Sequence, residues 1–194
     1  MPLQPRHLVP GLLLVLLGGC ASTPVTDTKS PYYVPTPGSR VVVHQRLEVP
    51  PETRRVFLQF GKIVAKHDLD EYYPNCDFEI ASLAKEPRYI EPGTYTVTRV
   101  QQRVDSIVSN GPVMVAALDT ARLFGGMDSQ NDGLSSQFEE VRMFLKSDSP
   151  SELRKLSCRG AIAEPVDMVL PTLADMRRAL GDFASLAVPE EKTR

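Results

Sequence analysis

The sequence predicts a mainly β protein, either an antiparallel β-sandwich or a partly closed barrel, with one C-terminal amphipathic helix. Short runs rich in β-branched and aromatic residues recur between residues 40 and 162, and turn residues separate them. Such regular spacing is typical of antiparallel sandwiches and barrels. Helical periodicity is clear only after Pro171. The 17 prolines argue against long uninterrupted helices.

The first predicted strands lie in RVVVHQRLEV (40–49) and RRVFLQFGKIV (54–64), and Pro50-Pro51-Glu52-Thr53 forms the loop between them. The next run, NCDFEIAS at 75–82, alternates strictly between apolar and polar residues. Its apolar side chains share one face, and Asp77 and Glu79 take the other. This alternation predicts a half-buried strand.

The run EPGTYTVTRVQQRV (91–104) begins with a Pro92-Gly93 turn and then directs Tyr95 and Val97 to one face. Further short runs continue the strand series at 106–109, 112–118, 139–147 and 152–162.

The last element is an amphipathic helix predicted from about residue 172 to residue 186. Four apolar residues recur there at helical spacing: Leu173, Met176, Leu180 and Phe183. Thr172 followed by Asp175 forms a capping-box pattern at its start. We expect the helix to lie against the sheet, although docking into another protein is the alternative. The tail at 189–194 should be mobile.

The N-terminus has the layout of a secretory signal peptide, predicted at residues 1–19. Arg6 precedes an apolar block, and small residues follow it. The block is about half of the roughly 20 residues that a membrane-spanning helix needs. A buried N-terminal strand or helix is the alternative, as is a conventional signal peptide cut near Ala21.

The four residues Leu17-Gly18-Gly19-Cys20 resemble the lipobox of bacterial lipoproteins. Gly18 departs from the usual alanine or serine. The resemblance implies cleavage before Cys20 and lipid attachment to its thiol, so that several acyl chains anchor the protein in a membrane. Ala21 in place of aspartate implies the periplasmic face of the outer membrane. Residues 20–39, rich in small residues and proline, then form a flexible tether, and 40–188 form a single periplasmic β-rich domain.

Two cysteines remain once Cys20 carries lipid. The compartment beyond the cytoplasmic membrane is oxidising, which favours a Cys76–Cys158 disulfide. Such a bridge closes a loop of about 80 residues and contributes roughly 4 kcal/mol to stability in the chain-entropy treatment. Two separate buried thiols are the alternative. A catalytic or metal-binding pair is disfavoured because no CxxC spacing occurs.

Three further segments resemble uncharacterised proteobacterial envelope lipoproteins: YYPNCDFEI at 72–80, EPGTYTVTRV at 91–100 and LADMRRALGDFASL at 173–186. The resemblance implies an envelope location and a disulfide-bearing domain. It implies no particular activity.

One stretch, MDSQNDGLSSQFEE, has part of the pattern of an EF-hand calcium loop. Asp128, Asp132 and Glu139 occupy loop positions one, five and twelve, where they would supply oxygen ligands. Gln130 and Ser135 depart from the pattern. A loop that joins two strands is the alternative interpretation. Apart from this possible calcium and the covalent lipid on Cys20, we expect no cofactor.

The sequence therefore predicts an outer-membrane lipoprotein that acts as a non-catalytic interaction or structural module, with another envelope protein as its partner. The formal charge is −2 and no dense basic block occurs, so nucleic acid is not an expected partner. The serine-hydrolase, zinc-protease, P-loop and dinucleotide motifs are absent from the sequence. A calcium-binding envelope protein and a cell-envelope hydrolase are the alternative functions.

Overall fold

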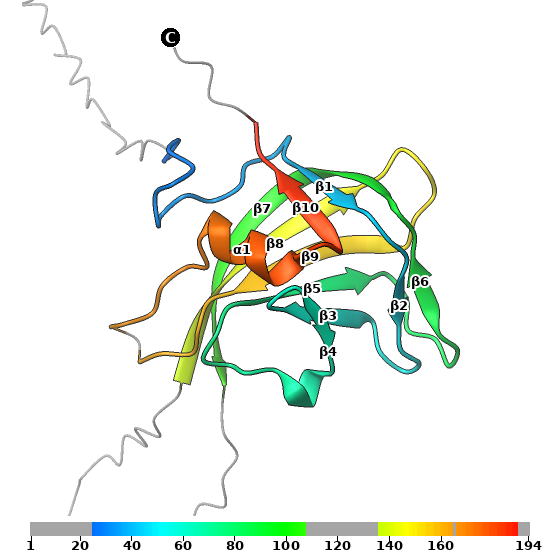
Figure 1. The fold of residues 1–194 in the computed structure, drawn as a ribbon, viewed down its shortest axis with the longest axis horizontal. Helices are drawn as coiled ribbons and strands as arrows, with labels where there is room; N and C mark the ends of the chain where they lie inside the picture. Colours follow the sequence, from blue (N-terminus) through cyan, green and yellow to red (C-terminus); the bar gives the residue numbers. More distant parts are fainter. Residues whose placement is uncertain (1–24, 108–135, 165, 190–194) are drawn as a thin grey trace, which may run out of the picture.

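A computed structural model describes residues 25–107, 136–164 and 166–189 and confirms the predicted fold class (Figure 1). One antiparallel sheet of eight strands curls into a half-barrel, so the partly closed barrel is correct and the sandwich is not. The strands are β1 (Arg40–Val43), β2 (Leu47–Val49), β3 (Arg55–Gln59), β4 (Lys62–Val64), β5 (Asn75–Ile80), β6 (Arg88–Ile90), β7 (Gly93–Ile107), β8 (Ser136–Lys146), β9 (Leu153–Arg159) and β10 (Ala184–Ala187).

The strand order in the sheet is β10-β1-β7-β8-β9-β5-β3-β4, while β2 and β6 form a separate two-stranded ribbon. A short 3₁₀ turn, η1 (Lys66–Asp68), follows β4. The single α-helix, α1 (Leu173–Leu180), contacts β10 at one edge of the sheet and β3 and β5 near the other edge. The helix therefore lies across the opening of the curled sheet, and the hydrophobic core fills the space between them.

The start of α1 is as predicted, but its end is not. Thr172 and Asp175 form the capping box, and the buried face comprises Leu173, Met176, Ala179 and Leu180. The prediction that the helix continues to residue 186 is wrong. Gly181 ends the helix with a φ of 54°, and residues 184–187 pair with β1 as strand β10.

The predicted tether is too long at its C-terminal end. Tyr33 is only 4% exposed and belongs to the core, seven residues before the predicted domain start at Arg40. The backbone N–H of Gly38 donates to the carbonyl of Val97 at 2.8 Å, and the N–H of Val97 donates to the carbonyl of Ser39 at 2.8 Å. Residues 33–39 are therefore part of the fold.

The predicted disulfide between Cys76 and Cys158 is present in the structure. The two cysteines face each other on neighbouring strands β5 and β9, with a Cα–Cα distance of 4.0 Å. The sulfur of Cys76 lies 3.9 Å from the carbonyl oxygen of Met176, so the bond is buried beneath α1.

Several predictions fall on residues that the structure does not describe. They are the signal peptide at 1–19, Cys20, the run at 112–118 and most of the tail at 189–194. Within the described residues, no helix has the length and apolar character needed to cross a membrane.

Candidate functional site: a groove over a charged cluster

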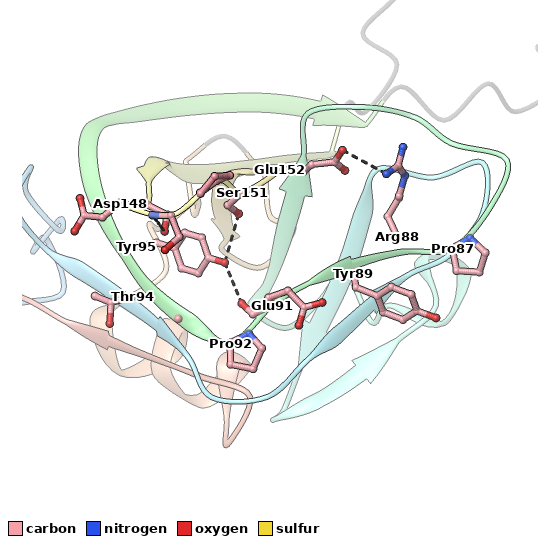
Figure 2. Close-up of a pocket in the computed structure, with 14 residues that line it drawn as sticks. Pro87, Arg88, Tyr89, Glu91, Pro92, Thr94, Tyr95, Asp148, Ser151 and Glu152 are labelled. Atoms are coloured by element: carbon pink, nitrogen blue, oxygen red, sulfur yellow. Dashed lines mark hydrogen bonds and ion pairs between the residues drawn. The ribbon is translucent and has the colours of Figure 1, made fainter.

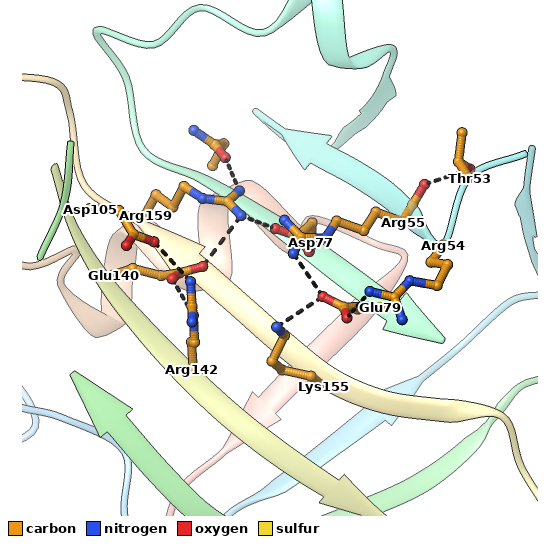
Figure 3. Close-up of polar contacts among 11 residues, drawn as sticks. Thr53, Arg54, Arg55, Asp77, Glu79, Asp105, Glu140, Arg142, Lys155 and Arg159 are labelled. Carbon is orange, nitrogen blue, oxygen red and sulfur yellow. Dashed lines mark hydrogen bonds and ion pairs between the residues drawn. The ribbon is translucent and has the colours of Figure 1, made fainter. Parts of the chain in front are cut away.

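The face of the sheet opposite the core carries a cluster of charged side chains. β5 directs Asp77 and Glu79 to this face, as its alternation predicts, but Asp77 is 0% exposed, so the strand is buried on both faces there. The neighbouring strands place Ser157 and then Arg142 beside Asp77. We call the following residues the charged cluster (Figure 3): Arg54, Arg55, Asp77, Glu79, Asp105, Glu140, Arg142, Lys155 and Arg159.

Arg159 holds the centre of the charged cluster, where it lies between two buried carboxylates (Figure 3). Its Nη2 atom is 2.6 Å from Oδ1 of Asp77 and 3.3 Å from Oε1 of Glu140. Its Nη1 atom donates to the side-chain oxygen of Asn75 at 3.3 Å. Burial raises the pKa of Asp77, although the charges of Arg159 and Arg55 oppose the shift.

Glu79 forms the second centre and binds three cations. Its carboxylate lies 2.9 Å from Nζ of Lys155, 2.9 Å from Nη2 of Arg55 and 3.3 Å from Nη2 of Arg54. Burial alone would raise the pKa of Glu79. The hydrogen bond from Lys155 and the positive charges of Arg55, Lys155 and Arg54 outweigh burial, and together they lower this pKa.

Two guanidinium groups of the cluster keep unused donors. Arg142 donates through Nε to Glu140 and through Nη2 to Asp105 at 2.8 Å. Arg55 contacts Glu79 through Nη2 and Asp77 through Nε at 3.7 Å. Within the described part of the chain, the Nη1 atom of each arginine has no acceptor. The carboxylates therefore fix these side chains without saturating them.

A groove of about 920 Å³ lies over the charged cluster and is open to solvent. Its polar lining includes Arg55, Arg142 and Arg159, and its apolar lining consists of Phe57, Leu69, Leu83, Val104, Phe138 and Ile162. We call it the arginine groove.

The wall of the arginine groove around residues 66–71 is held in place by the buried side chain of Gln59. Its Nε2 atom donates to the carbonyl of Asp70 at 2.8 Å, and its Oε1 atom accepts the N–H of Asp70 at 3.0 Å. The N–H of Ile162 donates to the carbonyl of Glu71 at 2.8 Å, which ties this wall to the segment after β9. The groove is thus built on fixed backbone.

A second pocket of about 650 Å³ lies at the turns between β6 and β7 and between β8 and β9 (Figure 2). The Tyr95 hydroxyl donates to the carbonyl of Glu91 at 3.0 Å and lies 3.5 Å from Oγ of Ser151. Arg88 lies 3.5 Å from Glu152. Because these polar groups bind one another, the arginine groove is the stronger candidate for a ligand site.

The predicted calcium ligands are not brought together within the described structure. Asp128 and Asp132 lie outside the described residues, and Glu139 lies in β8 opposite Val104. The twelfth residue of an EF-hand loop leads into a helix, whereas Glu139 is within a strand. Among the described residues, no group of three or more His, Cys, Asp or Glu side chains is placed to hold a metal ion.

Sequence reasoning did not identify the charged cluster. A partial indication was present, since Asp77 and Glu79, Glu140 and Arg142, and Lys155 and Arg159 each fall on the polar face of an alternating strand. The sequence does not show which strands are neighbours, and in the sheet β5 pairs with β9 and β9 pairs with β8.

Comparison of the chain with protein-family models, with curated proteins and with solved structures finds no match.

Proposed function

We propose that this protein is a lipid-anchored component of the bacterial cell envelope whose β domain is a non-catalytic interaction module. The anchor is Cys20 at the periplasmic face of the outer membrane, and the binding site is the arginine groove. The observation that carries the proposal is a solvent-open groove lined by guanidinium groups. Neighbouring carboxylates hold these groups in place, and the groups still have free donors.

The groove is better suited to binding than to covalent chemistry. Its described lining contains no cysteine, serine or histidine. The hydroxyl of Thr53, which also lines it, donates to the carbonyl of Pro50 at 2.9 Å. A serine or cysteine nucleophile beside a histidine base is therefore not among the described lining residues, while hydrogen-bond donors and apolar walls are.

The proposed anchor would hold the domain close to the bilayer. The first residue of the hydrophobic core is Tyr33, 13 residues after Cys20. Thirteen residues span at most about 47 Å when fully extended. A lipid on Cys20 would therefore keep the domain near the membrane surface, where its partners would be other envelope proteins.

The anchor is tested by metabolic labelling with palmitate. The wild-type chain should incorporate the label, and Cys20→Ser should not. Incorporation by both chains would refute the anchor.

The binding site is tested by crosslinking in the native envelope with the lipidated chain. A photoreactive residue replaces Leu83, which lines the groove and is 63% exposed. The matched control replaces Val166, which is 84% exposed and lies outside the groove lining. We expect a discrete adduct from position 83 that position 166 does not form. Identical patterns from both positions would exclude the groove as the contact site.

A further inference from the structure

We infer that the arginine groove recognises a single carboxylate carried on an apolar stretch of a partner protein, that is, one Asp or Glu with apolar neighbours. The inference rests on the proposed function and specifies the chemistry of the partner. Three features of the groove lead to it: the unused guanidinium donors, the apolar walls, and the distribution of its negative charges.

The donors define an oxyanion ligand. The Nη1 atoms of Arg55 and Arg142 meet no acceptor in the described structure, and both side chains line the groove. Arginine offers a planar set of donors that matches a carboxylate. Because Glu79, Glu140 and Asp105 already fix these side chains, a ligand loses little rotamer entropy when it pairs with them.

The walls define what carries the carboxylate. Val104 is 52% exposed and Leu83 is 63% exposed, and both line the groove together with Phe138 and Ile162. Apolar side chains on either side of the bound carboxylate would cover these walls and remove their surface from water. Exclusion of water would also strengthen the central ion pair.

The negative charges limit the ligand to one carboxylate. Glu52, Glu71 and Asp105 also line the groove, and Glu52 and Glu71 are exposed. They would repel a run of several acidic residues, but they would not repel a single carboxylate that lies at the arginines. The same mixture of charges in an open groove is unfavourable for a buried acyl chain, so we assign a peptide segment rather than a lipid.

The assignment is tested by selection from a bead-bound heptapeptide library on the full mature chain. Flanking positions vary among Ala, Val, Leu, Ile, Phe and Ser, and the central position varies among all residues. We expect enrichment of Glu and Asp at the centre. Replacement of that residue by Gln or Asn in a selected peptide should weaken binding at least about tenfold in a fluorescence polarisation titration.

Two matched substitutions then locate the site. Val104→Asp adds a negative charge within the groove, and Val166→Asp adds the same charge to an exposed valine outside its lining. We expect Val104→Asp to weaken binding of the selected peptide at least about tenfold and Val166→Asp to leave this binding unchanged. Because both valines are exposed, thermal unfolding should confirm that both variants fold.

Equal effects of the two substitutions would overturn the inference, as would selection of peptides without a central carboxylate or of none. Binding of phosphatidylglycerol vesicles that is lost in Val104→Asp, with no peptide selected, would assign the groove to an anionic lipid instead. A groove-specific adduct in the envelope together with failure of the peptide selection would retain the proposed function and reject only this ligand chemistry.

Discussion

Asp77 and Glu79 lie two residues apart on β5 in the same charged cluster, but the pKa of Asp77 is raised and the pKa of Glu79 is lowered. The pKa of Asp77 is raised above 3.8, so its contribution to stability is complete below pH 3.8 and is lost as pH rises through the folded-state value. The pKa of Glu79 is lowered below 4.5, so its contribution is complete above pH 4.5 and is lost as pH falls through the folded-state value. Near neutral pH the contribution of Glu79 to stability is therefore complete.

The substitution Glu79→Gln should lower the free energy of unfolding at pH 7 by about 1.5–3 kcal/mol, because hydrogen bonds to charged groups contribute on this scale. It leaves Lys155, Arg55 and Arg54 without their shared carboxylate. The difference from the wild type should narrow as pH falls through the folded-state pKa of Glu79, which lies below 4.5, because Glu79 itself then becomes protonated. Urea unfolding across a pH series measures both effects.

Glu86→Gln is the matched control, since Glu86 is exposed and forms no ion pair within the described structure. It should change the free energy of unfolding by less than about 0.5 kcal/mol at any pH. If the deficit of Glu79→Gln persisted unchanged at low pH, it would have to come from packing rather than from charge.

Single residues also show where sequence reasoning succeeds. The pairing of Cys76 with Cys158 could be predicted because the sequence has three cysteines, and the expected lipid on Cys20 leaves only one combination. The burial of Asp77 could not be predicted, because it depends on Arg159 from β9 and Arg55 from β3. Which strands become neighbours is a non-local property that alternation within one strand does not contain.

Among the elements, the hairpin between β3 and β4 determines where α1 must end. Its two-residue turn, Phe60-Gly61, has positive φ at both positions, as a type I′ turn requires. The N–H of Gly61 donates to the carbonyl of Ala179 at 3.1 Å, which seats the turn on the last turn of the helix. Gly181 lies directly against Gly61.

This contact explains the error in the predicted helix. Phe183 continues the helical apolar spacing, so periodicity alone extends the helix to residue 186. In the fold, Gly181 leaves the helix and β10 gains backbone hydrogen bonds from β1. The capping box at Thr172 was predictable because it is local, whereas the helix end depends on two segments more than a hundred residues away.

Gly181→Ala should therefore destabilise the fold by about 2–4 kcal/mol, combining strain at positive φ with overpacking. A Cβ atom at this position would lie 2.4 Å from the Cα atom of Gly61, and the backbone would have to move. Gly93→Ala is the control, because its Cβ would meet only the Tyr95 ring at 3.8 Å. Chemical denaturation should show a loss for Gly93→Ala below about 1 kcal/mol, and equal losses would contradict the close-contact argument.

For the whole molecule, the two faces of the half-barrel carry different kinds of side chains. The inner face and α1 bury the apolar core and the disulfide, while the opposite face carries the charged cluster beneath the arginine groove. Loss of exposed side chains in the groove should thus affect binding without affecting the core. The N-terminal segment connects the domain to the proposed lipid anchor. Residues 33–39 pack on the sheet and lie within 20 residues of Cys20.

The two adjacent tyrosines of this segment test where the tether ends and the domain begins. Tyr33 is 4% exposed and belongs to the core, whereas Tyr32 is 74% exposed. Tyr33→Ala should lower the free energy of unfolding by about 3 kcal/mol, the scale for removing a buried aromatic ring, and Tyr32→Ala should change it by less than about 0.5 kcal/mol. Urea unfolding of the two variants measures the difference. If neither substitution affected stability, residues 25–39 would belong functionally to the tether and the folded domain would begin at Arg40, as composition alone predicts.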